Sequence, residues 1–271
     1  MKKTIITPEA DSLWLSLKKI WKYRELAYSF AIRDLKVKYA QTWLGVGWSV
    51  IQPLTALLIF TFFFGYILHW KAEGLPYSLY VLSGLLGWNF FSYIVYQGVS
   101  SIQGSSHLIK KIYFPKSILP ISKVYVAFVE LIISFILLIP LMFWFKEELS
   151  WKLIFIPLAL FFNILAALSI VFFANAFAYK KKDVYHLVPF LMYFGIWVTP
   201  VFFTKNILPE SLSVIWYLNP MASIVELWRW SLFSNLEFDL FYIPSLIVLL
   251  PLFLIGLWLF VKAERKFSDF L

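Results

Sequence analysis

Few residues of this chain could do chemistry, and three of them stand out. Glu130 lies alone within a long apolar run, and Glu226 and Arg229 lie three residues apart in another apolar segment. A carboxylate in such a setting is rare and costly, so we expect Glu130 either to have a functional role or to be a structural group bonded within a helix bundle. The i, i+3 spacing allows Glu226 and Arg229 to pair on one face of a helix.

The sequence lacks the signatures of known catalytic sites. It contains no Gly-x-x-x-x-Gly-Lys-[Ser/Thr] phosphate loop, no Gly-x-Ser-x-Gly elbow and no His-Glu-x-x-His motif. It has no cysteine, which excludes disulfides and cysteine-ligated metals. We therefore expect no catalytic residue, metal or cofactor in this chain. Intramembrane acids are also too sparse for a transporter driven by protons or sodium ions, so uphill transport would need energy from a partner.

Six long apolar stretches must position these residues. Most of the stretches reach the length of about 20 residues that crosses a bilayer as a helix. They run over residues 44–68, 77–100, 120–145, 153–178, 186–203 and 241–261. The sequence thus predicts an all-α integral membrane protein with six transmembrane helices, built as an N-terminal region (1–43) and a membrane domain (44–271).

The basic residues alternate with these stretches. Residues 1–43, 101–123, 179–184 and 262–271 carry 19 of the 24 Lys and Arg residues. The positive-inside rule therefore predicts that both termini are cytoplasmic. The net charge of +9 lies at membrane edges, so an anionic leaflet explains it better than nucleic acid does.

Residues 12–38 are predicted to form one amphipathic helix that lies on the membrane. At about 100° per residue, most basic side chains gather on one face, while Trp14, Leu17 and Ile20 begin the opposite, apolar face. Arg24 and Lys38 break this pattern. The basic face holds Lys18, Lys19, Lys22, Arg33 and Lys36. Such a helix is typical of a membrane interface, although an ordinary soluble amphipathic helix would show the same pattern.

The segment 101–119 is predicted to be a cytoplasmic loop that contains a short helix between Gly104 and Pro115. Proline disfavours a helical conformation at the residue before it, which limits the helix at that end. A helix of this length is not stable alone, so we expect a cytoplasmic partner to hold it.

The region 204–236 is predicted to contain two short helices that fold partway back into the outer leaflet. Its apolar pieces, 214–218 and 221–233, are too short to cross a bilayer and have the length of re-entrant or interfacial segments. Glu226 and Arg229 lie on the second piece, where they form either a structural pair or a gate at the outer mouth.

Aromatic residues make up 21% of the chain. Interfacial belts account for some Trp and Tyr residues, but others lie away from the ends of the apolar stretches. They serve either as packing bulk or as a lining that stacks on sugar rings. The candidates for such a lining are Trp43, Trp48, Tyr93, Tyr96, Tyr193 and Trp197.

Several segments, in the same order, resemble the membrane subunit of polysaccharide ABC exporters, the group that exports O-antigen, teichoic acid and capsular glycans. Lys116 stands where many members have Arg, which keeps the charge. The resemblance covers nearly the whole chain and rests on residues 33–45 with Trp48 and Pro53, on 114–120, 182–184 and 199–202, and on 217–221 with Glu226 and Arg229.

The resemblance implies a homodimer in a bacterial cytoplasmic (inner) membrane, with each subunit docked on an ATPase that binds ATP and Mg²⁺. The substrate would be a polysaccharide on a lipid carrier, of the O-antigen or teichoic-acid type. The loop that receives the ATPase stroke would present His107, Lys110, Lys111, Tyr113, Phe114 and Pro115. The outer gate would be formed by Trp216, Tyr217, Asn219, Pro220, Glu226 and Arg229.

Three alternatives remain at this point. An ABC exporter of drugs or other lipids would use the same architecture, but it would not need aromatics on several spans. A membrane-bound glycosyltransferase would need acidic residues near a membrane face, and Asp34 and Asp183 lie in no acidic cluster. A scaffold without a transport role would not explain Glu130 or the broken outer region.

Overall fold

All regular secondary structure in the part of the chain that the computed structural model describes is helical, apart from a single antiparallel bridge between Ala72 and Leu75. The described residues are 12–40, 42–70, 72–148, 150–204, 207, 209 and 212–267. The predicted all-α class is confirmed. Parts of the predicted N-terminal region, outer region and C-terminus lie outside the described residues, namely 1–11, 41, 205, 206, 208, 210, 211 and 268–271.

Five described helical segments are long and apolar enough to cross a membrane, which makes the chain a multi-pass membrane protein. Two of them begin with a short 3₁₀ turn, and the first ends in a π-helix. They are α3 with η1 (Gly47–Phe60, Thr61–Ile67), α4 (Tyr77–Gly104), α6 (Ile118–Trp144), η2 with α7 (Trp151–Phe155, Ile156–Ala178) and η5 with α11 (Leu240–Tyr242, Ile243–Glu264).

The predicted fifth span forms a shorter helix than the others. α8 covers Val184–Gly195, which is 12 residues, and the chain continues in turns through Phe203. Gly195 and Pro200 follow one another closely here and both disfavour a continuous helix. Six crossings therefore stay a prediction, because α8 alone is shorter than a bilayer-spanning helix.

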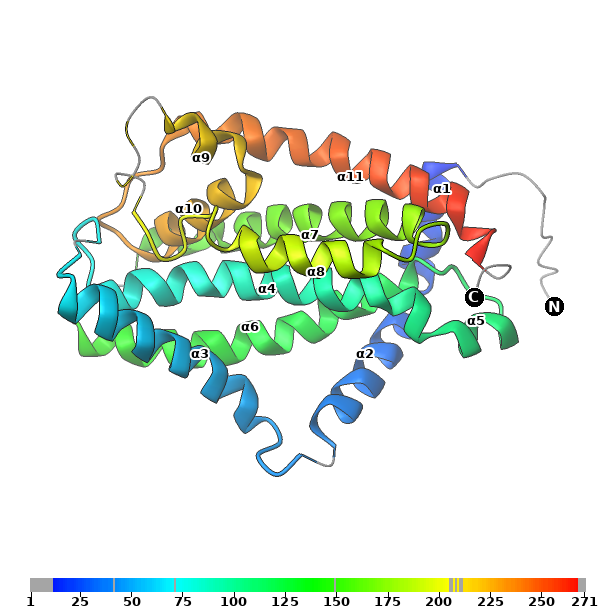
Figure 1. The fold of residues 1–271 in the computed structure, drawn as a ribbon, viewed down its shortest axis with the longest axis horizontal. Coiled ribbons are helices and arrows are strands. Elements are labelled where there is room, and N and C mark those ends of the chain that lie inside the picture. Colours follow the sequence, from blue (N-terminus) through cyan, green and yellow to red (C-terminus); the bar gives the residue numbers. More distant parts are fainter. Residues whose placement is uncertain are drawn as a thin grey trace.

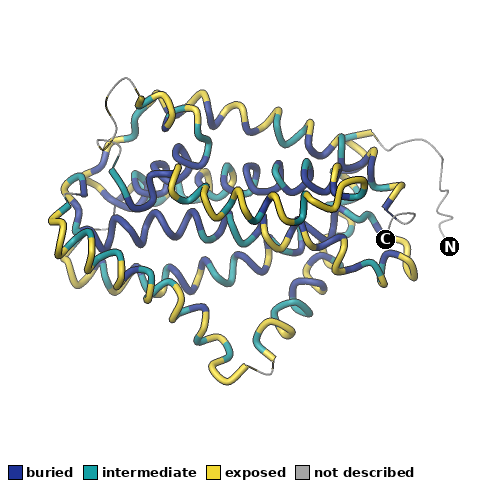
Figure 2. The backbone as a smooth tube through the Cα atoms, in the orientation of Figure 1, coloured by how far each residue is buried: buried dark blue, intermediate teal, exposed yellow. Residues whose placement is uncertain are grey.

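Helix α4 forms the centre of the molecule (Figure 1). It packs against α6, α7, α8 and α10, and most of its residues are buried (Figure 2). α11 packs along α7 on one side, whereas the end of α2 and the start of α3 project from the bundle and meet at a turn. Gly45 in that turn has φ +52°, a left-handed conformation that glycine adopts without steric cost.

Two glycines of α4 allow α10 to approach it closely. A Cβ atom at Gly84 would lie 2.6 Å from Arg229 Nη2, and one at Gly87 would lie 2.8 Å from Trp228 Cδ1. Both distances are too short for real Cβ contacts. Small residues in this span thus allow the two helices to pack closely.

The predicted single helix over 12–38 is wrong, because the chain breaks at Tyr23 into α1 (Leu13–Lys22) and α2 (Arg24–Tyr39). The two helices have different anchors. α1 contacts α11, whereas α2 packs along α6, where Asp34 pairs with Lys123. One straight helix would not reach both. Trp14 and Trp21 of α1 remain exposed, as the interfacial prediction requires.

The short helices predicted between the spans are present. α5 (Ser106–Lys111) lies at the same end of the bundle as α1 and the C-terminus of α11, which we call the basic end because it carries Lys110, Lys111 and residues 180–182. α9 (Val214–Leu218) and α10 (Pro220–Leu232) lie at the opposite end. α10 is inserted between α4 and α7, so nearly all of its residues are buried.

Candidate functional site

A polar cavity of about 490 Å³ lies between α3, α4 and α6. Its chemistry is unusual for an apolar bundle, since amide, hydroxyl and aromatic groups face one space. It is lined by Lys38, Ser49, Gln52, Pro53, Ala56, Leu85, Asn89, Ser92, Tyr93, Tyr96, Gln97, Glu130 and Ser134. Donors, acceptors and flat ring faces together suit a ligand rich in hydroxyl groups.

Glu130 lies at one wall of this cavity and is bonded to residues far from it in sequence. Its carboxylate pairs with Lys38 and accepts hydrogen bonds from Tyr39 Oη (2.8 Å) and Ser49 Oγ (3.2 Å). Burial, with a smaller contribution from Glu130, raises the pKa of Tyr39 to about 12, against the opposing effect of Ser49. The geometry therefore supports the structural alternative for Glu130, as a bonded carboxylate.

No metal site accompanies this carboxylate. Within the described ranges, no group of three or more His, Cys, Asp or Glu side chains lies close enough together to hold a metal ion. Lys38 also lies 4.8 Å from the ring centroid of Tyr93, so the charges of the Lys38–Glu130 pair are placed against an aromatic wall.

Two of the six predicted lining aromatics, Tyr93 and Tyr96, share the cavity. The other four lie elsewhere. Trp43 is 97% exposed at the turn between α2 and α3, and Trp48, Tyr193 and Trp197 are exposed on or near α3 and α8. The structure thus brings together only the pair on α4, and the lining role of the six stays a prediction.

An aromatic cluster that sequence reasoning missed joins α3–η1 to the segment after α8. The rings of Phe60 and Phe202 stack with centroids 3.7 Å apart and planes 12° apart. Phe64 packs edge-on to Phe203, and Trp197 contacts Phe60. The two segments lie about 140 residues apart, so sequence spacing cannot predict that they meet. Only the high aromatic content of the chain indicated that such a cluster could form.

Arg229 is the best-connected charge of the bundle. It is 0% exposed, and Nη1 donates to Glu226 Oε1 (2.7 Å) and Tyr80 Oη (2.9 Å). Nη2 donates to the Val201 carbonyl (2.9 Å), and the guanidinium lies 3.6 Å from the Tyr80 ring centroid. The predicted i, i+3 pairing with Glu226 is confirmed.

The segment 198–203, which we call the outer strap, is held by hydrogen bonds at several points. Tyr77 Oη donates to the Phe202 carbonyl (2.9 Å) and Tyr80 Oη to the Phe203 carbonyl (2.8 Å). Asn219 Nδ2 donates to the Val198 carbonyl (3.0 Å). The strap therefore depends on α4 and α10 together, and the two tyrosines were not among the predicted gate residues.

The remaining predicted gate residues have ordinary structural contacts. Asn219 Oδ1 accepts from Met221 N (3.0 Å) and caps α10, which begins with Pro220. Trp216 is buried. Tyr217 Oη donates to Asp239 Oδ2 (2.8 Å); burial and this carboxylate raise the pKa of Tyr217 to about 12.

The predicted coupling residues divide into an exposed and a buried set. His107, Lys110, Lys111 and Tyr113 are exposed at the basic end, whereas Phe114 is buried, edge-on to Phe30 of α2 (5.6 Å). Two residues after Phe114, the backbone amide of Lys116 donates to Glu264 Oε1 of α11 (2.6 Å). α5 and its linker are thus tied to both α2 and α11.

Comparisons with known proteins agree with this architecture. The O-antigen export system permease protein RfbA of Klebsiella pneumoniae is 27% identical over 242 residues, which are 88% of this chain and 92% of that protein. RfbA of Myxococcus xanthus is 26% identical (77% of this chain, 80% of that protein), and the polysialic acid transport protein KpsM of Escherichia coli is 25% identical (73% and 77%).

The family model described as ABC-2 type transporter matches residues 26–233. This stretch runs from α2 through α10, so it contains the polar cavity, the coupling linker and the Glu226–Arg229 pair. A match over most of the chain shows the family. The chain belongs to the ABC-2 type transporter family.

Proposed function

We propose that this chain is the permease subunit of an ATP-driven exporter that moves a lipid-linked polysaccharide across a bacterial cytoplasmic membrane. The proposal is supported by its family and by relatives whose names describe O-antigen export and polysialic acid transport. The observation that carries it is the polar cavity with Tyr93 and Tyr96.

The cavity has the chemistry that a sliding glycan needs. Sugar rings present apolar C–H faces, on which aromatic rings pack, and hydroxyls, which bond to amides such as those of Gln52 and Asn89. Lys38 and Glu130 neutralise each other, so the wall has no net charge that would trap one sugar type. Weak contacts of this kind permit many registers along the polymer.

The energy comes from a partner in this proposal. A separate ATPase that binds ATP and Mg²⁺ docks at the basic end, against the exposed side of α5. Two copies of the chain form the channel, and both termini face the cytoplasm. Two contacts would carry a movement of the ATPase to the rest of the bundle. They are the contact of Phe114 with Phe30 and the hydrogen bond from Lys116 to Glu264.

The test is an export assay in a bacterial strain whose only copy of this permease is supplied on a plasmid. The double variant Tyr93→Ala/Tyr96→Ala is compared with Tyr93→Phe/Tyr96→Phe, which keeps both rings. Ile247→Ala, at an exposed residue of α11, is the control. We expect the alanine pair to lower surface glycan several-fold and to raise the intracellular lipid-linked glycan, whereas the other two variants export normally.

Normal surface glycan in cells without the permease would overturn the proposed cargo. Measuring drug efflux and phospholipid transfer in the same cells separates a glycan exporter from an exporter of drugs or other lipids. Normal export by the alanine pair, with the permease still required, would instead overturn only the role of the cavity. Purification of the tagged chain in mild detergent should recover a stoichiometric ATPase.

A further inference from the structure

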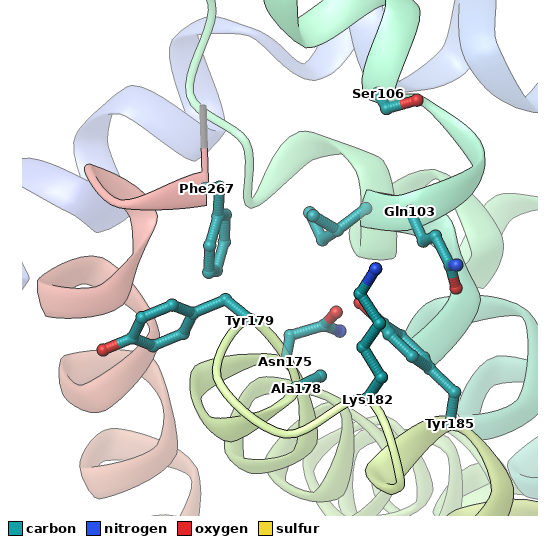
Figure 3. A pocket seen from close by; sticks show the side chains of 9 residues that line it. Gln103, Ser106, Asn175, Ala178, Tyr179, Lys182, Tyr185 and Phe267 are labelled. Atoms are coloured by element: carbon teal, nitrogen blue, oxygen red, sulfur yellow. The ribbon is translucent and has the colours of Figure 1, made fainter. Parts of the chain in front are cut away.

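A second cavity, of about 320 Å³, lies at the basic end of the bundle (Figure 3). It is enclosed by the ends of α4 and α7, the start of α5 and α8, and Phe267 beyond α11. It shares no lining residue with the glycan cavity proposed above. Its volume is at the lower end of the range of about 300–1,000 Å³ for small-molecule sites, which fits a headgroup rather than a polymer.

Asn175 provides this cavity with a hydrogen-bond acceptor of fixed orientation. The side chain is 1% exposed, and its amide nitrogen donates to the carbonyls of Gly98 (3.1 Å) and Val171 (3.0 Å). These two bonds fix the orientation of the amide. No described residue donates to Oδ1, which is buried at the cavity wall. A buried carbonyl oxygen without a donor is unfavourable, so a ligand that donates a hydrogen bond there is stabilised.

Lys182 gives the cavity a positive charge. Figure 3 shows its ammonium group directed into the same space as the Asn175 amide. No ion pair of Lys182 occurs among the described residues, and none of the described lining residues is acidic. The ligand that fits is therefore an anion that also carries a hydrogen-bond donor.

We propose that this cavity binds the headgroup of an anionic phospholipid of the phosphatidylglycerol type. The phosphodiester lies against Lys182, and a hydroxyl of the terminal glycerol donates to Asn175 Oδ1. Basic pockets between the ends of transmembrane helices are typical sites for anionic headgroups, and residues 180–182 attract the anionic leaflet. Because Gln103 and Ser106 flank the junction of α4 and α5, the bound lipid joins α5 to α8.

The test is native mass spectrometry of the full chain, purified in detergent and titrated with lipids that have identical acyl chains. Phosphatidylglycerol is compared with phosphatidylcholine, which has no donor and no net charge, and with phosphatidic acid, which lacks the glycerol hydroxyls. We expect phosphatidylglycerol to bind most tightly. Lys182→Ala should lower its affinity about fivefold, the contribution typical of one basic residue near anionic lipid.

Lys181→Ala is the matched control, because Lys181 is the exposed neighbour of Lys182 and does not line the cavity. Equal losses in the two variants, or equal affinities for phosphatidylglycerol and phosphatidylcholine, would overturn the site. Equal affinities for phosphatidylglycerol and phosphatidic acid would overturn the contact with Asn175. If Lys182→Glu abolishes ATPase recovery but leaves phosphatidylglycerol binding intact, the cavity docks a protein segment instead.

Discussion

At the scale of single residues, the buried charges of this protein hold segments together. Arg229 reaches the outer strap, α4 and its own helix through one guanidinium group. Its planar donors suit this task, since a lysine could not bond to three separate acceptors in the same geometry. Glu130, which is partly buried, likewise joins α2 and α3 to α6 at one wall of the polar cavity.

Replacing Arg229 by Ala should destabilise the protein strongly. The Glu226 carboxylate would be left buried without its counter-charge, which costs about 3–5 kcal/mol. Denaturant unfolding in detergent, followed by tryptophan fluorescence, measures the loss. Arg265→Ala is the control, since Arg265 is exposed at the end of α11 and should change stability by less than about 0.5 kcal/mol. Equal stabilities of the two variants would contradict the stabilising role of the Arg229 contacts.

Gly84→Ala tests the close approach of α4 and α10. The new methyl group would lie 2.6 Å from Arg229 Nη2 and 3.0 Å from the Val201 carbonyl, so the outer strap must shift. Overpacking of this kind costs about 1–3 kcal/mol. We expect a lower melting temperature, whereas Gly104→Ala in the same helix, with no atom within 4 Å of its Cβ, should be neutral or slightly stabilising. A fall of equal size in both variants would refute the contact.

At the scale of elements, α5 is a short helix that depends on its neighbours. Six residues do not form a stable helix alone, and this one is held by the buried Ile109 and by the fastened linker that follows it. The segment is anchored on its inner side and exposed on its outer side. This division is what a docking helix needs.

Tyr113→Ala should weaken the binding of the ATPase. Tyr113 is 60% exposed beside α5, and interface aromatics commonly contribute enough free energy for about a tenfold change in affinity. Surface-immobilised ATPase and purified chain give the dissociation constant. Tyr66→Ala is matched in residue type and in exposure, and its affinity should equal that of the wild type. A Tyr113→Ala affinity that equals wild type would remove α5 from the docking surface.

At the scale of the whole molecule, the bundle leaves α3 and η1 almost uncovered. The span Gly47–Ile67 has the smallest buried share of the five candidate spans, although its own Gln52 lines a polar cavity. Polar groups that face lipid are costly, so this side is expected to face a second copy of the chain. The exposed side of α3 and η1 is mainly apolar but includes Gln52 and Thr55, whereas the exposed side chains of α11 before Lys262 are all apolar or aromatic and can be covered by lipid.

Single cysteines test this arrangement directly, because the chain has none of its own. Trp48→Cys, Gln52→Cys and Leu58→Cys place thiols along α3, and Ile247→Cys places one on the exposed side of α11. A bifunctional maleimide should link the α3 variants into dimers in membranes, several-fold more efficiently than the control. Dimers at Ile247 only, or equal dimer yields at all four positions, would contradict a dimer interface at α3.

Sequence alone determined the features that depend on composition and local spacing. Long apolar stretches require helices in a bilayer, because lipid offers no partner for backbone polar groups. The i, i+3 pair and the short helices α5, α9 and α10 follow from residue spacing and segment length. Each of these predictions needs only neighbours a few residues away.

Only the tertiary structure decided which distant residues meet. Glu130 with Lys38, Arg229 with Val201, Phe60 with Phe202 and Asn175 with Gly98 are pairs separated by 28 to 142 positions. The break at Tyr23 also depends on such contacts, since α1 and α2 have separate anchors that overrule local helix propensity. Helix packing, which no local pattern encodes, therefore determines where the polar groups of this apolar chain come together.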